Sequence, residues 1–196
     1  AQTLYKAVVT AKTLPWAKLG VARAQLDAGQ INQATTALEK LLGEDANYAD
    51  AYDVMGRAQF ELGRFDKALE TYKMAASLTP ASISRVQNLA MMTYYSGDTL
   101  AAEGLLDKTV RLGLDSKMFD AQTLVMLAFT RLTTGDRKGL QRCHDDLLRL
   151  LDRDDGNPRL QRLADVVAAL NLIQQHQFAK AVDTVRAMTG TVRETS

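Results

Sequence analysis

The chain has 196 residues, of which 46% are hydrophobic and 24% are charged, as in an ordinary globular protein. Lysine and arginine number 24 against 23 for aspartate and glutamate, so the charge predicts neither a nucleic-acid partner nor a membrane partner. The single cysteine, Cys143, excludes a disulfide within the chain and fits a cytoplasmic location. No apolar run reaches about 18 residues and no secretory leader is visible, so we expect no membrane span.

Residues 1–14 are predicted to form a leading helix, because Leu4, Tyr5, Val8 and Val9 recur at helical spacing. Two interpretations remain open for this helix. It either caps the rest of the chain, or it is the second helix of a pair whose first helix precedes Ala1. The chain begins with alanine and not methionine, which fits a fragment or a processed form.

Glycines at a spacing of 34 residues, Gly29, Gly63 and Gly97, divide the following sequence into helix pairs, and Gly135 comes 38 residues later. Small residues recur on the same grid in both helices of each pair. The sequence therefore predicts a single domain over 1–196 with five repeats. Their ranges are 15–48, 49–82, 83–116, a degenerate repeat at 117–154 and a degenerate repeat at 158–190.

The second repeat, ADAYDVMGRAQFELGRFDKALETYKMAASLTPAS, shows the pattern most completely. Gly56 and Ala68 are small where the two helices are expected to cross, since larger side chains would push the helices apart. Gly63 ends the first helix and Pro80 stops the second. Three aromatic residues are expected to fill the wedge between the helices: Tyr52, Phe65 and Tyr72.

Local signals also predict the turns and caps of the later repeats. Asp98 and Asp136 stand where an N-cap side chain is needed, and Asp155 or Asn157 is expected to cap the helix that starts at Pro158. His176 occupies the turn position that glycine holds in the other repeats. In the degenerate fourth repeat, the first helix is longer by about one turn, and Gly139 and Leu140 replace the usual alanine.

This set of residues resembles the tetratricopeptide repeat family, whose repeat of about 34 residues has large, small and turn residues at these spacings. The resemblance implies an all-α fold, a right-handed superhelix of about five helix pairs plus an N-terminal helix. It also implies that the first helix of each repeat lines a concave groove that binds a partner protein or an extended peptide. By the resemblance, the candidate groove residues are Trp16, Leu19, Arg23, Asp53, Arg57, Gln87, Asn88, Met91, Tyr94, Tyr95, Met126 and Phe129.

The expected groove is charged in repeats one and two, aromatic and amide-rich in repeat three, and apolar in repeats four and five. Arg23 and Arg57 can clamp a carboxylate or a peptide backbone, and Asn88 can bond a backbone amide. A structural interpretation stands beside this one: Arg23 pairs with Asp53, and Arg57 pairs with Asp27 or Asp50. The chaperone-type members of the family hold a C-terminal carboxylate with lysine and asparagine, and Leu19 and Arg23 depart from that pattern.

An alternative function follows from a narrower resemblance. PWAKLGVARAQLDAGQ and the later ALEKLL resemble the repeat region behind the receiver domain in some bacterial response regulators. The chain would then be a signalling output domain. A homodimer through the end helices is also possible, with Leu4, Val8, Val182 and Val185 as the contact residues.

No cofactor, metal or catalytic site is predicted. Cys143, His144, Asp145 and Asp146 are adjacent on a helix and point in different directions, so they cannot hold one metal ion together. The run from Asp152 to Gly156 lacks the glycine and glutamate positions of a calcium loop. With two histidines and no glycine-rich phosphate loop, the sequence predicts that the chain is not an enzyme.

Overall fold

The computed structural model describes residues 3, 14–114, 119–154 and 156–193. The leading helix predicted at 1–14 therefore lies almost wholly outside the described residues. By its internal contacts the chain divides into two compact units, unit 1 over 1–96 and unit 2 over 97–196. The boundary falls inside the predicted repeat 83–116, so the two helices of that repeat belong to different units.

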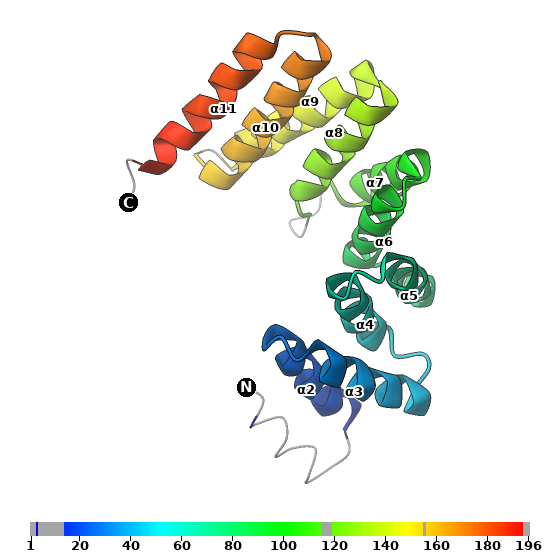
Figure 1. The fold of residues 1–196 in the computed structure, drawn as a ribbon. Helices are drawn as coiled ribbons and strands as arrows, with labels where there is room; N and C mark the ends of the chain where they lie inside the picture. Colours follow the sequence, from blue (N-terminus) through cyan, green and yellow to red (C-terminus); the bar gives the residue numbers. More distant parts are fainter. Residues whose placement is uncertain (1–2, 4–13, 115–118, 155, 194–196) are drawn as a thin grey trace. The chain divides into compact units, whose positions relative to one another are not determined.

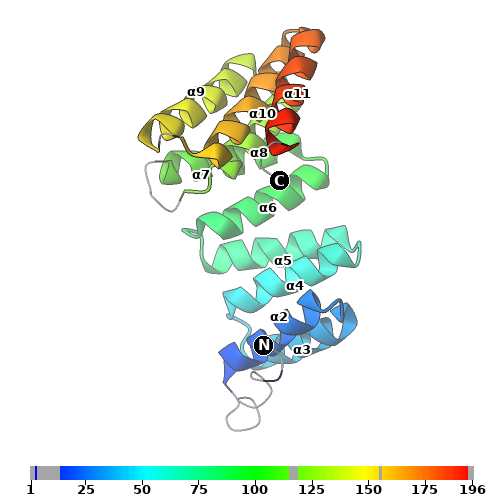
Figure 2. The ribbon, with the colours of Figure 1, turned by 90° about the vertical axis from the view of Figure 1, so that its left-hand side faces the viewer.

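Unit 1 contains five described helices, two antiparallel pairs followed by α6 (Figures 1 and 2). Neighbours along the chain pack against each other, from α2 with α3 through to α5 with α6, and α2 also contacts α4. The helices are α2 (Pro15–Asp27), α3 (Ile31–Glu44), α4 (Ala49–Glu61), α5 (Phe65–Leu78) and α6 (Ile83–Tyr95).

The described residues of unit 2 form five further helices, and here too each helix packs against the next (Figure 1). In addition, α8 packs against α10, so the first helices of successive pairs form one layer. The helices are α7 (Thr99–Gly113), α8 (Gln122–Thr134), α9 (Arg137–Arg153), α10 (Pro158–Gln174) and α11 (Phe178–Arg193). The described part of the chain contains no strand, and none of its helices is long and apolar enough to span a membrane.

The helix ends follow the predicted local signals. Asp98 accepts a hydrogen bond from the Ala101 amide at 3.1 Å, and Asp136 accepts one from the Gly139 amide at 2.9 Å. Asn157 caps α10 by accepting from the amides of Arg159 and Leu160 at 3.0 and 3.2 Å. His176 adopts a φ of 60°, the left-handed conformation that Gly29, Gly63, Gly97 and Gly135 adopt at the other turns.

The small residues of the repeat lie in the helix interfaces, and Ala22, Ala34, Ala68 and Ala102 are fully buried. Of the three aromatic residues expected in the wedge of the second repeat, Tyr72 is buried and Tyr52 is half-buried. The expectation for Phe65 is wrong, because its side chain is 52% exposed. Phe65 is the first residue of α5, so it lies beside the turn and contacts the edge of the Phe60 ring.

Candidate functional site

A groove of about 530 Å³ lies on unit 1 and is lined mainly by the first helices of successive pairs. Helices α2, α4 and α6 each place side chains in it, and α5 contributes Tyr72 to its wall. Such a volume suits a few side chains of a bound segment. The lining residues are Arg23, Asp27, Asp53, Val54, Arg57, Phe60, Glu61, Tyr72, Asn88 and Met91.

Arg57 lies between two carboxylates in this groove. Its guanidinium donates to Asp27 at 3.0 Å and to Glu61 at 2.9 Å. Burial lowers the pKa of Arg57, but the interactions with the two carboxylates outweigh that effect, so the pKa is raised. The predicted pair with Asp27 is therefore present. Arg57 is more than half exposed, so each pair contributes at most about 1 kcal/mol to stability.

The predicted pair between Arg23 and Asp53 is not formed. Asp53 instead accepts from Arg85 at 2.8 Å, and the same guanidinium also pairs with Asp50. Arg85 comes from α6 and is mostly buried, so it reaches a carboxylate that Arg23 was expected to neutralise. Arg23 is exposed, and among the described residues it forms no ion pair.

Burial raises the pKa of the Asp53 carboxyl, and the hydrogen bond from Arg85 opposes that shift. One of its oxygens, Oδ1, is buried without a hydrogen-bond partner among the described residues. Burying a carboxylate without full pairing is costly. Asp53 thus gives the floor of the groove an acceptor whose bonding is incomplete.

The wall of the groove is set by Tyr72 of α5, which is 5% exposed. A Cβ atom added to Gly56 would lie 2.8 Å from its ring, so glycine is required at that position for the ring to pack. The same burial raises the pKa of Tyr72 to about 12. A fixed ring here holds α4 and α5 at the separation that shapes the groove.

Four aromatic side chains form what we call the aromatic ledge: Phe60, Phe65, Tyr94 and Tyr95. The centroids of Phe60 and Tyr95 lie 6.0 Å apart with the rings 26° from parallel, and Phe65 meets Phe60 edge-on at 5.5 Å. Tyr94 contacts Tyr95 edge-on at 6.0 Å. Because Phe60 also lines the groove, the ledge is continuous with it.

Some of the predicted site residues of unit 1 lie in the groove or the ledge, and the others do not. Arg23, Asp53, Arg57, Asn88 and Met91 line the groove together, and Tyr94 and Tyr95 belong to the ledge. Leu19 is 4% exposed and packs in the core of unit 1, so we leave it out of the site. Trp16 is half exposed near the start of α2 and Gln87 is half-buried on α6, and neither lines the groove.

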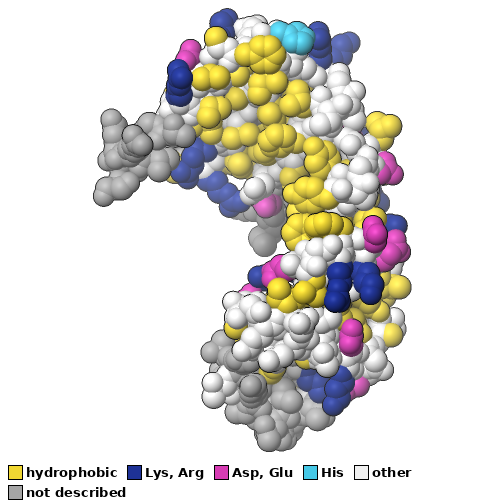
Figure 3. Space-filling model, in the orientation of Figure 1, with side chains coloured by type: hydrophobic (Ala, Val, Ile, Leu, Met, Phe, Trp, Pro, Cys, Tyr) yellow, Lys and Arg dark blue, Asp and Glu magenta, His cyan; other side chains and the backbone are white. Residues whose placement is uncertain are grey.

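Met126 and Phe129, the last two predicted residues, lie on α8 in unit 2. There, hydrophobic side chains gather on the face formed by α8, α10 and α11 (Figure 3). Phe129 is 43% exposed, and Ile173 of α10 is also exposed. Val182 and Val185, named for self-association, are exposed on α11, whereas Leu4 and Val8 lie outside the described residues.

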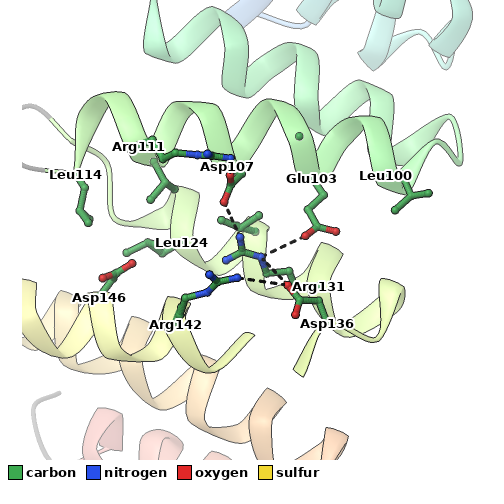
Figure 4. A pocket seen from close by; sticks show the side chains of 13 residues that line it. Leu100, Glu103, Asp107, Arg111, Leu114, Leu124, Arg131, Asp136, Arg142 and Asp146 are labelled. Carbon is green, nitrogen blue, oxygen red and sulfur yellow. Dashed lines mark hydrogen bonds and ion pairs between the residues drawn. The ribbon is translucent and has the colours of Figure 1, made fainter. Parts of the chain in front are cut away.

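Unit 2 also holds a second cavity, of about 700 Å³, between α7, α8 and α9 (Figure 4). At its floor lies the buried Arg131, which donates to Asp107 at 2.6 Å and to Glu103 at 3.3 Å. The same guanidinium donates to the Gly139 carbonyl and to Cys143 Sγ. Since its donors are used within the protein, we interpret this cluster as structural, and the sequence pattern gave no sign of it.

Gly139 is explained by this cluster. A Cβ atom at Gly139 would lie 1.9 Å from Oδ2 of Asp136, 2.6 Å from Nε of Arg131 and 2.7 Å from Cδ of Arg131. Burial raises the pKa of the neighbouring Cys143 thiol to about 11, so the thiol stays protonated near neutral pH.

The described residues contain no group of three or more His, Cys, Asp or Glu side chains that could hold a metal ion.

Sequence reasoning missed Phe60, Tyr72 and Arg85 as parts of the site. Phe60 stands three positions after Arg57 and seven after Asp53, so it shares their face of α4 and the helical register could have included it. Tyr72 was assigned to packing, and it does pack, but one edge of it faces the groove. Arg85 gave no signal, because its partners Asp50 and Asp53 are more than 30 residues away.

The family model for the tetratricopeptide repeat matches residues 25–91, which span α3, α4 and α5 and most of α6. These residues therefore match the tetratricopeptide repeat family. The helix pairs of the chain are stacked as in a helical solenoid, and repeats of this family serve as scaffolds for protein–protein interactions. A comparison with curated proteins found no match.

Several solved tetratricopeptide repeat structures share the fold. YrrB, described as having an unusual peptide-binding site, matches with a TM-score of 0.68 at 15% identity, covering 94% of this chain and 93% of YrrB. TTC0263, a protein of Thermus thermophilus, matches with a TM-score of 0.66 at 20% identity, covering 85% of this chain and 89% of that one. MamA matches with a TM-score of 0.66 at 16% identity over 88% of both chains. None of these three is described as a response regulator.

Proposed function

We propose that this protein binds an extended segment of a partner protein in the groove of unit 1, with no covalent step. The observation that carries the proposal is the groove itself, to which three successive first helices contribute side chains. YrrB, with the same fold, is described as having a peptide-binding site. That description supports a peptide ligand here without naming one.

The groove offers the kinds of contact that an extended segment needs. Asn88 can donate to and accept from a peptide backbone, and Arg23 supplies an exposed cation without an ion pair among the described residues. Met91, Val54 and Phe60 provide apolar area for side chains. Apolar lining with a few placed polar groups is typical of binding sites that fix a ligand's orientation.

The test is a screen of the full chain against a library of random 12-residue peptides, followed by fluorescence anisotropy on the peptides selected. Asn88→Ala should weaken binding by about 2- to 10-fold, because it removes a hydrogen bond to the backbone. Met91→Ala should weaken it similarly by removing buried apolar area. Met74→Ala is the matched control, since Met74 is exposed on α5 and does not line the groove.

The two possible negative results have different meanings. If the library yields no binder, the groove is not a site for extended peptides. If binders are found but Asn88→Ala and Met91→Ala bind them as well as the unchanged protein does, the peptides bind elsewhere. Either result would overturn the proposal.

A further inference from the structure

We propose that the segment bound by unit 1 is basic, and that one of its arginine side chains stacks on the aromatic ledge while pairing with Glu61 and Asp27. This inference rests on the proposed function and specifies the chemistry of the partner. It differs from both ligand groups expected for Arg23 and Arg57, which were a carboxylate and a peptide backbone. Two features of the groove carry it, its charge arrangement and the continuity of its wall with the ledge.

The charge arrangement leaves carboxylates in excess. Asp27 and Glu61 share the single cation of Arg57, and each uses one oxygen in the hydrogen bond to it. Neither carboxylate has another ion-pair partner among the described residues. Asp53 is paired with Arg85, so the excess is local: two acids, Asp27 and Glu61, face the one arginine, Arg57, at this end of the groove. Arg57 is thus already occupied, so an incoming cation matches this part of the groove better than an incoming carboxylate.

The ledge begins where these carboxylates are. Phe60 precedes Glu61 in α4 and lines the groove, and its ring is nearly parallel to that of Tyr95. Tyr95 is 59% exposed, which leaves much of its surface open. Aromatic faces carry partial negative charge and attract cations placed within about 6 Å. The carboxylates and the rings therefore favour the same ligand group.

Helix polarity adds to this preference. Glu61 is the last residue of α4 and Tyr95 is the last residue of α6, so both lie at helix C-termini. The carbonyl groups at a helix C-terminus carry partial negative charge and favour a nearby cation. Asp27 likewise ends α2. Three C-termini thus meet the groove at the end where the ledge begins.

The geometry favours arginine over lysine. A guanidinium is planar, so it can stack on an aromatic ring while its N–H groups donate to a carboxylate at its edge. The ammonium of lysine is compact and strongly hydrated, and it loses more on leaving water. A proline or an aliphatic residue would use the rings alone and would gain nothing from Asp27 and Glu61. Those residues are the competing occupants that the experiment must exclude.

The first experiment changes the peptide. In a 12-residue binder selected from the library, each arginine is replaced in turn by citrulline, which keeps the shape of the side chain and removes its charge. We expect one replacement to weaken binding to the full chain by about tenfold, measured by fluorescence anisotropy. If binders contain no arginine, or if every citrulline peptide binds within twofold of its parent, the inference is wrong while the proposed function stands.

The second experiment changes the protein. It predicts a rise in affinity for a ligand held through an arginine and a fall in affinity for a ligand held through a carboxylate. Arg57→Gln releases Asp27 and Glu61 for the incoming arginine, so the arginine peptide should bind about threefold or more tightly. A ligand held through its carboxylate would instead lose affinity in this variant. A fall in affinity with Arg57→Gln therefore overturns the inference.

The ledge is tested separately with Tyr95→Leu, which keeps apolar area and removes the aromatic face. We expect it to weaken the arginine peptide by about 3- to 10-fold and to leave the citrulline peptide within twofold. Phe178→Leu is the matched control, because Phe178 is an equally exposed aromatic residue on α11 of unit 2. Equal losses for the arginine and citrulline peptides would assign the ledge to apolar contact and overturn the cation's role there.

Discussion

Single residues explain both the regular and the irregular repeats. Gly56 is required because the Tyr72 ring lies where its Cβ atom would be, and Gly139 is required because the Asp136 carboxylate and the Arg131 side chain lie there. The first of these was predictable, since a small residue at that position belongs to the repeat pattern. The second was not, because the buried arginine comes from the preceding helix and nothing in the local sequence indicates where it points.

The contrast between Gly139 and Gly104 gives a direct test of this interpretation. Both glycines lie within helices of unit 2, but a Cβ atom at Gly104 meets nothing within 4 Å. Gly139→Ala should lower the free energy of unfolding by about 1–3 kcal/mol through overpacking against Asp136 and Arg131. Gly104→Ala should raise it by up to about 1 kcal/mol, because alanine favours the helix. Urea unfolding measures both, and an unchanged stability for Gly139→Ala would contradict the packing account.

His176 carries a second prediction at this scale. Its φ of 60° is strained for a residue with a Cβ atom, and its ring gains only an edge contact with Phe178 at 5.9 Å. His176→Gly should therefore raise the free energy of unfolding by about 0.5–1 kcal/mol. His176→Ala loses the ring but keeps the strain, so it should not gain stability in thermal unfolding. A loss of stability in the glycine variant would show that the ring contact outweighs the strain.

At the scale of elements, helix periodicity and turn signals were enough to predict every helix that the structure describes in repeats one to five. Each predicted range holds two helices, and the caps at Asp98, Asp136 and Asn157 form as expected. Two expectations were wrong. The first helix of the fourth repeat was expected to be longer by about one turn, but α8 has 13 residues, as do α2, α4 and α6. The other error concerned Phe65, for which the repeat pattern implied burial. The structure exposes it because it begins α5, where the side chain faces the turn and Phe60.

The pairing of α4 and α5 makes a prediction about alkaline stability. The pKa of Tyr72 is raised to about 12 in the folded protein, whereas an unfolded tyrosine ionises near pH 10. Because the unfolded state loses this proton first, the stability that depends on it is complete below pH 10 and is lost as the pH rises to about 12. The loss should be about 2–3 kcal/mol.

Urea unfolding between pH 9 and pH 12 measures this dependence. Tyr72→Phe should flatten the fall in stability over that range, since the variant has no proton to lose at this position. Tyr95→Phe serves as the control and should keep the fall, because Tyr95 is exposed. Identical pH profiles for Tyr72→Phe and the unchanged protein would contradict the assignment.

At the scale of the whole molecule, the sequence predicted the family and the first helices that form the groove. Five of the twelve predicted site residues line the groove, because they follow the helical register. The charge pairing was only partly predictable: Arg57 pairs with Asp27 as expected, but Arg85 takes the place expected for Arg23 beside Asp53. Which of several cations reaches a carboxylate depends on side-chain burial, which spacing does not determine.

The most direct test of the central claim is hydrogen–deuterium exchange of the full chain with and without a peptide selected from the library. Binding in the groove of unit 1 should slow exchange in α2, α4 and α6, the helices that supply most of its lining. Exchange in α9 and α11 of unit 2 should stay unchanged. Protection confined to α8, α10 and α11, over the apolar face of unit 2, would contradict the account.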